Sequence, residues 1–504
     1  MSQHAPSLRR RVALAIALTI AFHAFALTVG LGLIAAPILG IVLADWANVW
    51  LAFFCIATGV TILRAIVPRR APFEAPGPEL RPEAQPRLFE VLRDVAREAG
   101  DEPPDAVYLA HDVNASVTEH GRPRRRVLLL GLPLLQALTV DELRAVVAHE
   151  HGHYVGGDLR AAAWVWRTRA ALFRTLDALY DEERWGRRLV AQPFKWYAKA
   201  FLRITNAVSR REELAADALA ARVAGTAAQA SALRSLAAAA AAFPAYVDDD
   251  LDPALALGGR PPIAEGFARF LAVPAVRSAT EEHLAQRLAE EQPDPYASHP
   301  TLRERLEALG ADPVASAEPA AGPRAVDLLD DLPALERGLL REPDELRPLG
   351  WEDVGSGLHA PAYAEDATAA AGALGTLTVA GAGDAVRDLT PLARRLAPED
   401  GEAPPEGALE AHAFHLVAGG VVAALHRAGW QVEALPGEPV TCRRGEHAIA
   451  PFADLGPVAR GDRPAGDWRE AVGGAGVGDL PLVPQEEPRF TRDAQPSTKS
   501  RTSA

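Results

Sequence analysis

The segment His149-Glu150-His151-Gly152-His153 has the residue types and spacing of a metal-dependent hydrolytic centre. His149 and His153 are four residues apart, so on a helix both imidazoles project from one face and can hold one metal ion. Neutral imidazole is a good zinc ligand, with Zn–N distances of about 2.0–2.1 Å. His151 lies about 200° around the helix from His149 and is not expected to share the metal.

Glu150 is the candidate general base of this centre. It neighbours His149 on the predicted helix and can reach a water molecule bound to the metal, whose pKa zinc lowers. The carboxylate then takes a proton from that water as it attacks a peptide carbonyl. Chance alone rarely produces such a segment in a chain of this length, so the pattern predicts a peptidase, which needs a third protein ligand.

The third ligand is expected from the helical pattern at residues 209–217, Ser-Arg-Arg-Glu-Glu-Leu-Ala-Ala-Asp. Glu213 and Asp217 are four residues apart and share a helix face, so one can bind the metal while the other orients a histidine. Glu212 lies about 100° off that face and is the alternative ligand. Taken by itself, the segment is more typical of an ordinary solvated helix face.

Two apolar runs precede this chemistry, and each is long enough to cross about 30 Å of hydrocarbon, the second only marginally. The first has no formally charged side chain between Val12 and Ala44. We predict a membrane anchor at residues 1–70, with transmembrane helices at about 12–40 and 46–68. A cleaved signal peptide is the alternative, but its apolar core would be about half as long.

Arginines flank this hairpin at both of its ends, at positions 9–11 and at 64, 69 and 70. The connection between the two helices carries no positive charge, so the positive-inside rule places both ends of the hairpin in the cytoplasm. We therefore predict a multi-pass protein of the cell membrane with its catalytic domain in the cytoplasm. No later segment is expected to cross, because charged residues interrupt the stretch from Trp164 to Phe201 at short intervals.

The whole chain is predicted to be mainly α (α+β). Short extended runs at 106–109 and 127–130 can form a hairpin or a small sheet, and further runs occur at 376–379 and 430–432. The predicted parts after the anchor are a proline-rich linker at 71–87, a peptidase domain at 88–315, a small α/β domain of unknown role at 322–485, and a disordered tail at 486–504.

Charge argues against a nucleic-acid partner, and cysteine content argues against a disulfide-stabilised fold. The formal net charge is −14 and no domain-sized basic patch occurs, so a nucleic-acid partner is not expected. The only two cysteines are Cys55 and Cys442, which excludes a disulfide framework.

The H-E-x-G-H segment, followed further along the chain by S-R-x-x-E-x-x-A-D, resembles the HtpX and CAAX prenyl protease family of membrane zinc metallopeptidases. Two other stretches are similar to that family. Asn114-Ala115 corresponds to an Asn-Ala pair on a strand at the family's cleft. The segment at 298–301, Ser-His-Pro-Thr, with Arg303 and Arg305, resembles a late His-Pro motif and its following arginine. The resemblance covers residues 80–310.

Carried over by position, the resemblance implies one Zn²⁺ ion per chain held by His149, His153 and Glu213. Glu150 would be the general base and Asp217 a partner of a ligand histidine. The implied fold is a zincin-like helical peptidase domain of the gluzincin type, with a small β-sheet.

The resemblance also implies roles around the cleft. Asn114, Ala115 and Arg210 become candidate substrate-binding residues, although a structural role for Arg210 is equally open. His299 becomes a candidate catalytic residue that stabilises an oxyanion or caps the cleft, and a structural role is at least as compatible with its position.

One departure from the family concerns the stretch between the two metal motifs. HtpX-like members usually carry additional membrane helices there, and this stretch is too charged for that. Its aromatic residues are instead expected to pack an amphipathic helix on the protein core, with packing against the bilayer surface as the alternative. These aromatic residues are Trp164, Trp166, Trp185, Trp196 and Tyr197.

The leading prediction is an endopeptidase that cuts membrane or membrane-proximal proteins, with the substrate extended along an edge strand near Asn114. Two alternatives remain open. One is an idle metal-binding scaffold that recruits a partner through the C-terminal domain, and the other is a dedicated enzyme that processes one peptide or lipidated protein. The sequence leaves the oligomeric state undetermined.

Overall fold

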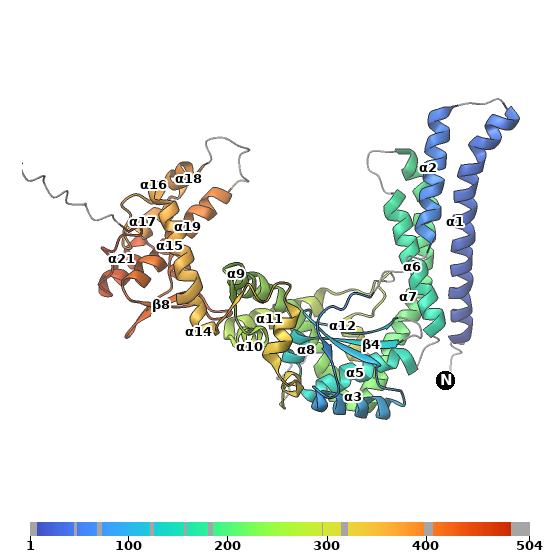
Figure 1. Cartoon of the computed structure of the whole chain (residues 1–504), viewed down its shortest axis with the longest axis horizontal. Helices are drawn as coiled ribbons and strands as arrows, with labels where there is room; N and C mark the ends of the chain where they lie inside the picture. Colours follow the sequence, from blue (N-terminus) through green and yellow to red (C-terminus); the bar gives the residue numbers. More distant parts are fainter. Residues whose placement is uncertain are drawn as a thin grey trace, which may run out of the picture. The chain divides into compact units, whose positions relative to one another are not determined.

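A computed structural model of the chain shows a mostly helical protein with small sheets (Figure 1), as the sequence predicted. The chain divides into two compact units, Met1–Pro244 with Pro274–Arg341, and Ala245–Val273 with Glu342–Ala504. The predicted domain boundaries stay predictions. The residues that the structure describes are 8–44, 48–67, 73–120, 125–155, 159–179, 185–294, 296–313, 321–397 and 407–484.

The first unit begins with a hairpin of two apolar helices, α1 (Leu8–Ala44) and α2 (Val49–Ile66). The helices approach closely at Gly30 and Gly59, where a Cβ on Gly59 would lie only 2.5 Å from the carbonyl oxygen of Gly30. Small residues let apolar helices approach to this distance, as they do in membranes. The predicted transmembrane hairpin is thus a packed helix pair.

Two later helices of the first unit, α6 (Leu159–Leu179) and α7 (Trp185–Ala224), pack against this hairpin (Figure 1). Their shared core is apolar and includes Phe22, Ile62, Leu172, Phe194 and Phe201. For this apolar face of α6 and α7, the structure agrees with the prediction that the stretch between the metal motifs packs on the protein core.

Two described aromatic side chains of this stretch are exposed instead, Trp196 of α7 at 69% and Phe173 of α6 at 40%. The side chains of Trp164, Trp166 and Trp185 lie outside the described residues.

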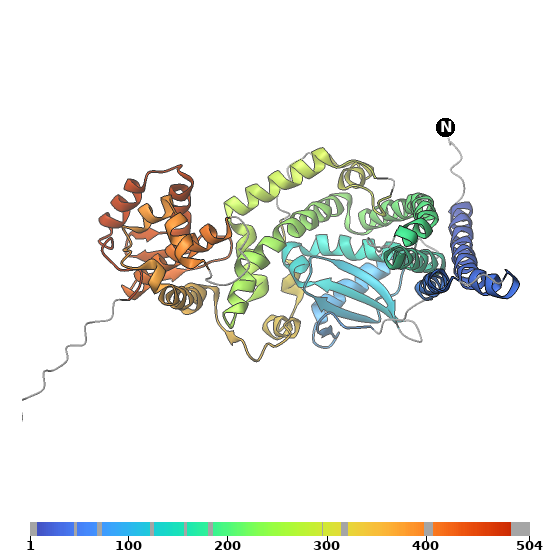
Figure 2. The same ribbon diagram turned by 90° about the horizontal axis from the view of Figure 1, so that it is seen from above.

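The sheet of the first unit has the strand order β1-β2-β4-β3 (Figure 2). The two predicted extended runs do form a small sheet, but they pair in parallel rather than as a hairpin. The chain between them forms a third strand that is antiparallel to β4, which makes β3 an edge. The strands are β1 (Glu79–Leu80), β2 (Ala106–Ala110), β3 (Ala115–His120) and β4 (Arg125–Gly131).

Helices surround this sheet and complete the first unit. The one that carries the histidine segment is α5 (Val140–Val155), as predicted. The others are α3 (Pro86–Ala99), α4 (Leu132–Ala137), α8 (Thr226–Tyr246), α11 (Pro274–Glu290), α12 (Leu302–Ala308), the short helix η2 (Ala325–Leu328) and α13 (Leu332–Leu339).

The second unit is built around the buried helix α19 (Ala408–Arg427) and a three-stranded sheet of order β7-β8-β9. The predicted extended run at 430–432 corresponds to β7. The run at 376–379 is not a strand, because the chain turns at Gly375 and only Thr378 forms an isolated bridge, with Pro481. The strands are β5 (Gly259–Arg260), β6 (Arg347–Pro348), β7 (Gln431–Glu433), β8 (Thr441–Arg444) and β9 (His447–Ile449). The remaining helices are η1 (Val247–Leu251), α9 (Asp252–Ala256), α10 (Ile263–Ala272), α14 (Trp351–Val354), η3 (Gly355–His359), α15 (Ala360–Ala369), α16 (Ala371–Leu374), α17 (Ala382–Arg387), α18 (Thr390–Leu396), α20 (Pro451–Arg460) and α21 (Ala465–Gly474).

Four helical segments among the described residues are long and apolar enough to cross a membrane, where the sequence prediction counted two. They are Ile16–Leu43, Val49–Ile66, Thr226–Ala256 and Ala408–Arg427. The last is 61% buried against the protein, compared with 17% and 22% for the first two. Burial in the core of the second unit accounts for the apolar composition of α19.

Candidate active site

Helix α5, which carries the histidine segment, is fixed at its N-terminus by a reciprocal cap. The backbone N–H of Thr139 donates to Glu142 Oε2 at 2.8 Å, and the N–H of Glu142 donates to Thr139 Oγ1 at 3.3 Å. Ser231 and Ser235 of α8 donate to the other oxygen of Glu142 at 2.6 and 2.8 Å. The cap satisfies helix N–H groups that would otherwise lack partners, and it ties α5 to α8.

Gly152 determines how closely α7 approaches α5. A Cβ built at this position would lie 2.7 Å from the Cα of Ala216 on α7 and 2.8 Å from its Cβ. Only glycine fits such a contact without a shift of the backbone. The glycine inside the histidine segment therefore lets α7 bring Glu213 and Asp217 to the two histidines.

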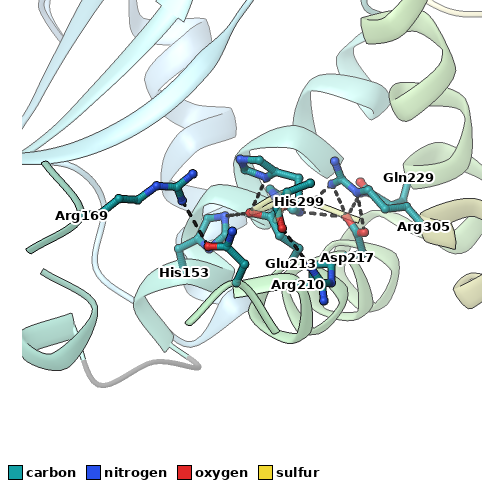
Figure 3. A network of polar contacts seen from close by, with 11 residues as sticks. His153, Arg169, Arg210, Glu213, Asp217, Gln229, His299 and Arg305 are labelled. Atoms are coloured by element: carbon teal, nitrogen blue, oxygen red, sulfur yellow. Dashed lines mark hydrogen bonds and ion pairs between the residues drawn. The ribbon is translucent and has the colours of Figure 1, made fainter. Parts of the chain in front are cut away.

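Glu213 of α7 contacts both imidazoles of α5, and Figure 3 shows it beside His153. His149 Nε2 lies 3.5 Å from Glu213 Oε2, and His153 Nε2 lies 3.7 Å from Glu213 Oε1. The two imidazole rings meet edge to face with centroids 4.9 Å apart. The structure thus brings together the three side chains that the sequence singled out as metal ligands.

The donor set fits one zinc ion. Two donors that are each about 2.0–2.2 Å from a tetrahedral ion lie roughly 3.3–3.6 Å apart, close to the separations seen here. Potential ligand atoms of His149, Glu150 and His153 also lie within 4.8 Å of one another. Since Glu213 contacts both imidazoles, it is the better third ligand, and Glu150 stays available to handle a proton.

Asp217, one turn beyond Glu213, holds the other side of His149. His149 Nδ1 lies 3.0 Å from Asp217 Oδ1, and the carboxylate is almost fully buried. Arg305 donates to both of its oxygens, at 2.6 Å from Nη2 and 2.8 Å from Nε, and Gln229 donates to Oδ1 at 2.8 Å. A carboxylate on the distal nitrogen of a histidine fixes the tautomer that leaves Nε2 free for a metal.

Charges in the site shift several pKa values. Burial opposes ionisation of Glu213, but hydrogen bonds from His149 and His299 outweigh it and hold the pKa of its carboxyl far below the usual range. Burial also opposes protonation of His149, yet its bonds to Asp217 and Glu213 raise its pKa to about 9. For His153, burial and the nearby His149 lower the pKa.

Glu150 lies between α5 and the edge strand β3. Burial, together with the charge of Glu213, raises the pKa of its carboxyl to about 7, although His149 acts in the opposite direction. The carboxylate accepts a hydrogen bond from the backbone N–H of Val117 on β3. A carboxyl with a pKa near neutrality can both accept and return a proton, as a general base requires.

Asn114 and Ala115 stand at the start of the same edge strand. The carbonyl oxygen of Asn114 accepts a hydrogen bond of 2.8 Å from the N–H of Gly131, and Ala115 pairs with Leu130. Because β3 is an edge, it can pair with an extended peptide on its open side. The structure thus places the predicted Asn-Ala pair on the strand that contacts Glu150.

His299 belongs to the loop before α12, and Arg210 of α7 contacts the backbone of that loop. His299 Nδ1 lies 3.0 Å from Glu213 Oε1, and its side chain is 68% exposed (Figure 3). Arg210 donates to the carbonyl oxygen of Ala297 at 2.9 Å and also reaches that of Asp294. These contacts give Arg210 a structural role that holds the loop carrying His299, and its substrate-binding role stays a prediction.

His151 points away from the metal site, as the helical angle predicted. It is buried, and its Nδ1 lies 2.8 Å from Asp101 Oδ2, while Arg126 donates to the other oxygen of Asp101 at 2.7 Å. The guanidinium of Arg126 in turn lies 4.5 Å from the ring centroid of Tyr154 on α5. This cluster anchors the far face of α5.

The sequence did not reveal the role of Arg305. A signal was present, because Thr301 and Glu304 form a capping box that starts α12 and places Arg305 one turn into the helix. Arg303, the other arginine of the motif, instead donates to the carbonyl oxygen of Leu288. Only the packing of α12 on α7 shows which arginine binds Asp217.

Comparison with known proteins agrees with this geometry. Residues 82–312 match the model of peptidase family M48. Protease HtpX of Pseudomonas fluorescens (strain SBW25) is 28% identical over 236 residues, which cover 44% of this chain and 70% of the relative. Protease HtpX of Hahella chejuensis (strain KCTC 2396) is 27% identical over 240 residues, covering 45% and 71%. No solved structure matches the chain.

Proposed function

We propose that this chain is a membrane-associated, zinc-dependent endopeptidase, since residues 82–312 match the model of peptidase family M48 and the relatives named Protease HtpX align with this region. Its proposed substrates are membrane or membrane-proximal proteins. The observation that carries the proposal is the convergence of His149, His153 and Glu213 beside the half-buried carboxyl of Glu150.

Each residue of the site has a separate role in the proposed reaction. Bound zinc would supply a Lewis acid that polarises the scissile carbonyl and makes water more acidic. Glu150 accepts a proton from the attacking water and returns it to the leaving amine, a transfer that suits its pKa of about 7. Asp217 and Arg305 keep the Nε2 atom of His149 directed into the site.

Strand β3 supports the proposed mode of substrate binding. Its open edge offers backbone N–H and C=O groups to an extended peptide, and Val117 on this strand already contacts Glu150. A peptide paired with β3 would therefore run directly past the general base. His299, exposed and in contact with Glu213, is the candidate to orient that ligand or to contact the substrate.

Two membrane crossings, by α1 and α2, form part of the proposal. Both helices expose most of their apolar surface, whereas the Ala408–Arg427 helix buries most of its surface in the second unit. The flanking arginines favour a cytoplasmic location for both ends and thus for the catalytic domain. A reporter fused after residue 75 should be active in the cytoplasm, and activity only on the outer side would refute this topology.

Purified full-length chain should bind about one zinc ion and cleave an unfolded membrane protein. Glu150→Gln should retain the zinc and lose cleavage, because only the proton acceptor is removed. Glu212→Gln is the matched control, since it makes the same change on a half-buried glutamate beside Glu213. Unchanged cleavage by Glu150→Gln would refute the mechanism, and zinc binding without any cleavage by the unaltered chain would favour the idle scaffold.

A further inference from the structure

One face of helix α7 carries two of the few lysines in the chain. The chain contains only three lysines, and two of them, Lys195 and Lys199, stand one helical turn apart on this helix. Trp196 lies between them and Arg203 follows one turn later. At 100° per residue these four side chains share one face of the helix, which we call the basic stripe.

Three of the four side chains of the basic stripe are exposed. Trp196 is 69% exposed, Lys199 and Arg203 are exposed, and Lys195 is half-buried. The opposite face of α7 is apolar and packs into the core shared with α1, α2 and α6. Its buried residues include Phe194, Ala198 and Phe201. Helix α7 is therefore amphipathic and is held along the membrane hairpin.

Packing within the hairpin gives the level of the stripe relative to the bilayer. Gly30 of α1 and Gly59 of α2 are in contact, so they lie at the same level. Helix α2 continues to Ile66, about 10 Å further at 1.5 Å per residue. The same distance back along the antiparallel α1 reaches His23, which therefore lies level with the end of α2.

Aromatic contacts place α7 at this same level. The ring of Phe22 lies 5.7 Å from that of Tyr197, and the ring of Phe25 lies 5.0 Å from that of Phe194. On the neighbouring helix α6, Arg174 donates to the carbonyl oxygen of Ala65 at 3.2 Å. The basic stripe thus begins at the level where α2 ends and runs toward the N-terminus of α1.

We propose that the basic stripe binds the anionic headgroups of the bilayer that the hairpin crosses. An exposed tryptophan next to lysines suits this level, because its ring partitions into the interface while the lysines reach phosphate groups. The charge also matches, since basic residues at a membrane surface attract anionic lipid. The chain as a whole is acidic, with a net charge of −14, so attraction to such a surface needs a local basic site.

Headgroup contact would fix the position of the metal site above the membrane. Arg203 and Glu213 belong to the same continuous helix and are ten residues apart, or about 15 Å along its axis. Lipid bound at the stripe therefore sets the distance between the bilayer surface and the cleft. This inference concerns lipid binding and stands whether or not the chain hydrolyses peptides.

The test compares two double variants of the full-length chain, Lys199→Gln/Arg203→Gln and Arg211→Gln/Arg222→Gln. Both remove two exposed positive charges from α7, but Arg211 and Arg222 lie further from the hairpin. Each protein is reconstituted in nanodiscs of equimolar phosphatidylcholine and phosphatidylglycerol and then extracted in mild detergent. Mass spectrometry measures the phosphatidylglycerol that stays bound, and thermal unfolding checks that both variants are folded.

The unaltered chain and the Arg211/Arg222 variant should retain an excess of phosphatidylglycerol that declines with added salt. The Lys199/Arg203 variant should lose that preference by roughly fivefold or more per charge at low salt. Equal retention by the two variants would refute the proposal and would leave an acidic protein as the partner to consider.

Trp196 offers an independent measurement. Lipids brominated near the headgroup should quench tryptophan fluorescence more strongly in the unaltered chain than in Trp196→Phe, because the difference isolates this one indole. An absence of that difference would place Trp196 away from the bilayer and overturn the assignment.

Discussion

Substitution of Asp217 tests how the site holds its metal. The Asp217 carboxylate is almost fully buried and is contacted by His149, Arg305 and Gln229 at distances of 2.6–3.0 Å. Asp217→Ala removes the acceptor for His149 Nδ1 and leaves the guanidinium of Arg305 buried without its partner. Both the affinity for zinc and the stability of the fold should therefore fall.

Two magnitudes follow from these contacts. Loss of a carboxylate behind a ligand histidine weakens metal affinity by about 10–100-fold. Breaking a buried ion pair by removal of one partner destabilises a protein by about 3–5 kcal/mol. Asp217→Asn keeps an acceptor oxygen for His149 but loses the charge, so it should fall between the unaltered chain and Asp217→Ala in both measurements.

The assay is competition for zinc with a chromophoric chelator, together with thermal unfolding. It should be run above pH 9, because the metal-free His149 has a pKa of about 9 and binds a proton below that value. Asp217→Ala also lowers this pKa, which would reduce proton competition and hide part of the loss at neutral pH. Measurement at high pH separates the two effects.

Gln229→Ala is the matched control. It removes one donor to the Asp217 carboxylate but leaves both Arg305 and His149 in place. Its zinc affinity should stay within about fivefold of the unaltered chain, the equivalent of about 1 kcal/mol, because the charge of Asp217 and its contact with His149 remain. Zinc affinity in Asp217→Ala that equals that of Gln229→Ala would show that Asp217 does not position the ligand, and the reasoning would fail.

Three further predictions concern packing and pH. Gly152→Val should separate α5 from α7, since even a Cβ would lie 2.7 Å from Ala216. The free energy of unfolding should fall by about 2 kcal/mol or more. Zinc content measured by atomic absorption should also fall, and normal zinc content would contradict the prediction. Apparent zinc affinity should rise with pH, by about tenfold per unit up to roughly pH 9, because zinc must displace the proton of His149, and a flat titration would argue against that ligand. In the second unit, burial raises the pKa of Asp250 to about 7, so the protonated carboxyl stabilises the fold fully below pH 4 and this stabilisation is lost as the pH rises through 7. Asp250→Asn should therefore stabilise this unit by about 1–2 kcal/mol at pH 8, less than the full shift implies because the carboxyl is partly exposed. At pH 4 the substitution should have no effect, and limited proteolysis measures the unfolding at both pH values.

Helical periodicity and composition could be read from the sequence because they are local properties. The spacing of His149 and His153 places them on one face of any helix, and a long uncharged apolar run predicts a membrane helix in any fold. The same angles excluded His151 from the metal site. The sequence thereby determined the helix of the site, the position of its candidate base and the apolar hairpin.

Tertiary packing decided what depends on contacts between distant segments. Helix spacing could not distinguish Glu213 from Glu212, whereas the close approach of α7 at Gly152 brings Glu213 to both imidazoles. Packing also selected Arg305 over Arg303 as the partner of Asp217.

Pairing and exposure were likewise decided by the fold. The two extended runs of the first unit pair in parallel because a third strand lies between them in the chain, which leaves β3 at the edge beside Glu150. Trp196 is exposed because the other face of α7 packs on the membrane hairpin. Which partner a side chain meets, and which face stays open, depends on how helices and strands fill space together, and that is not encoded in the spacing of any one segment.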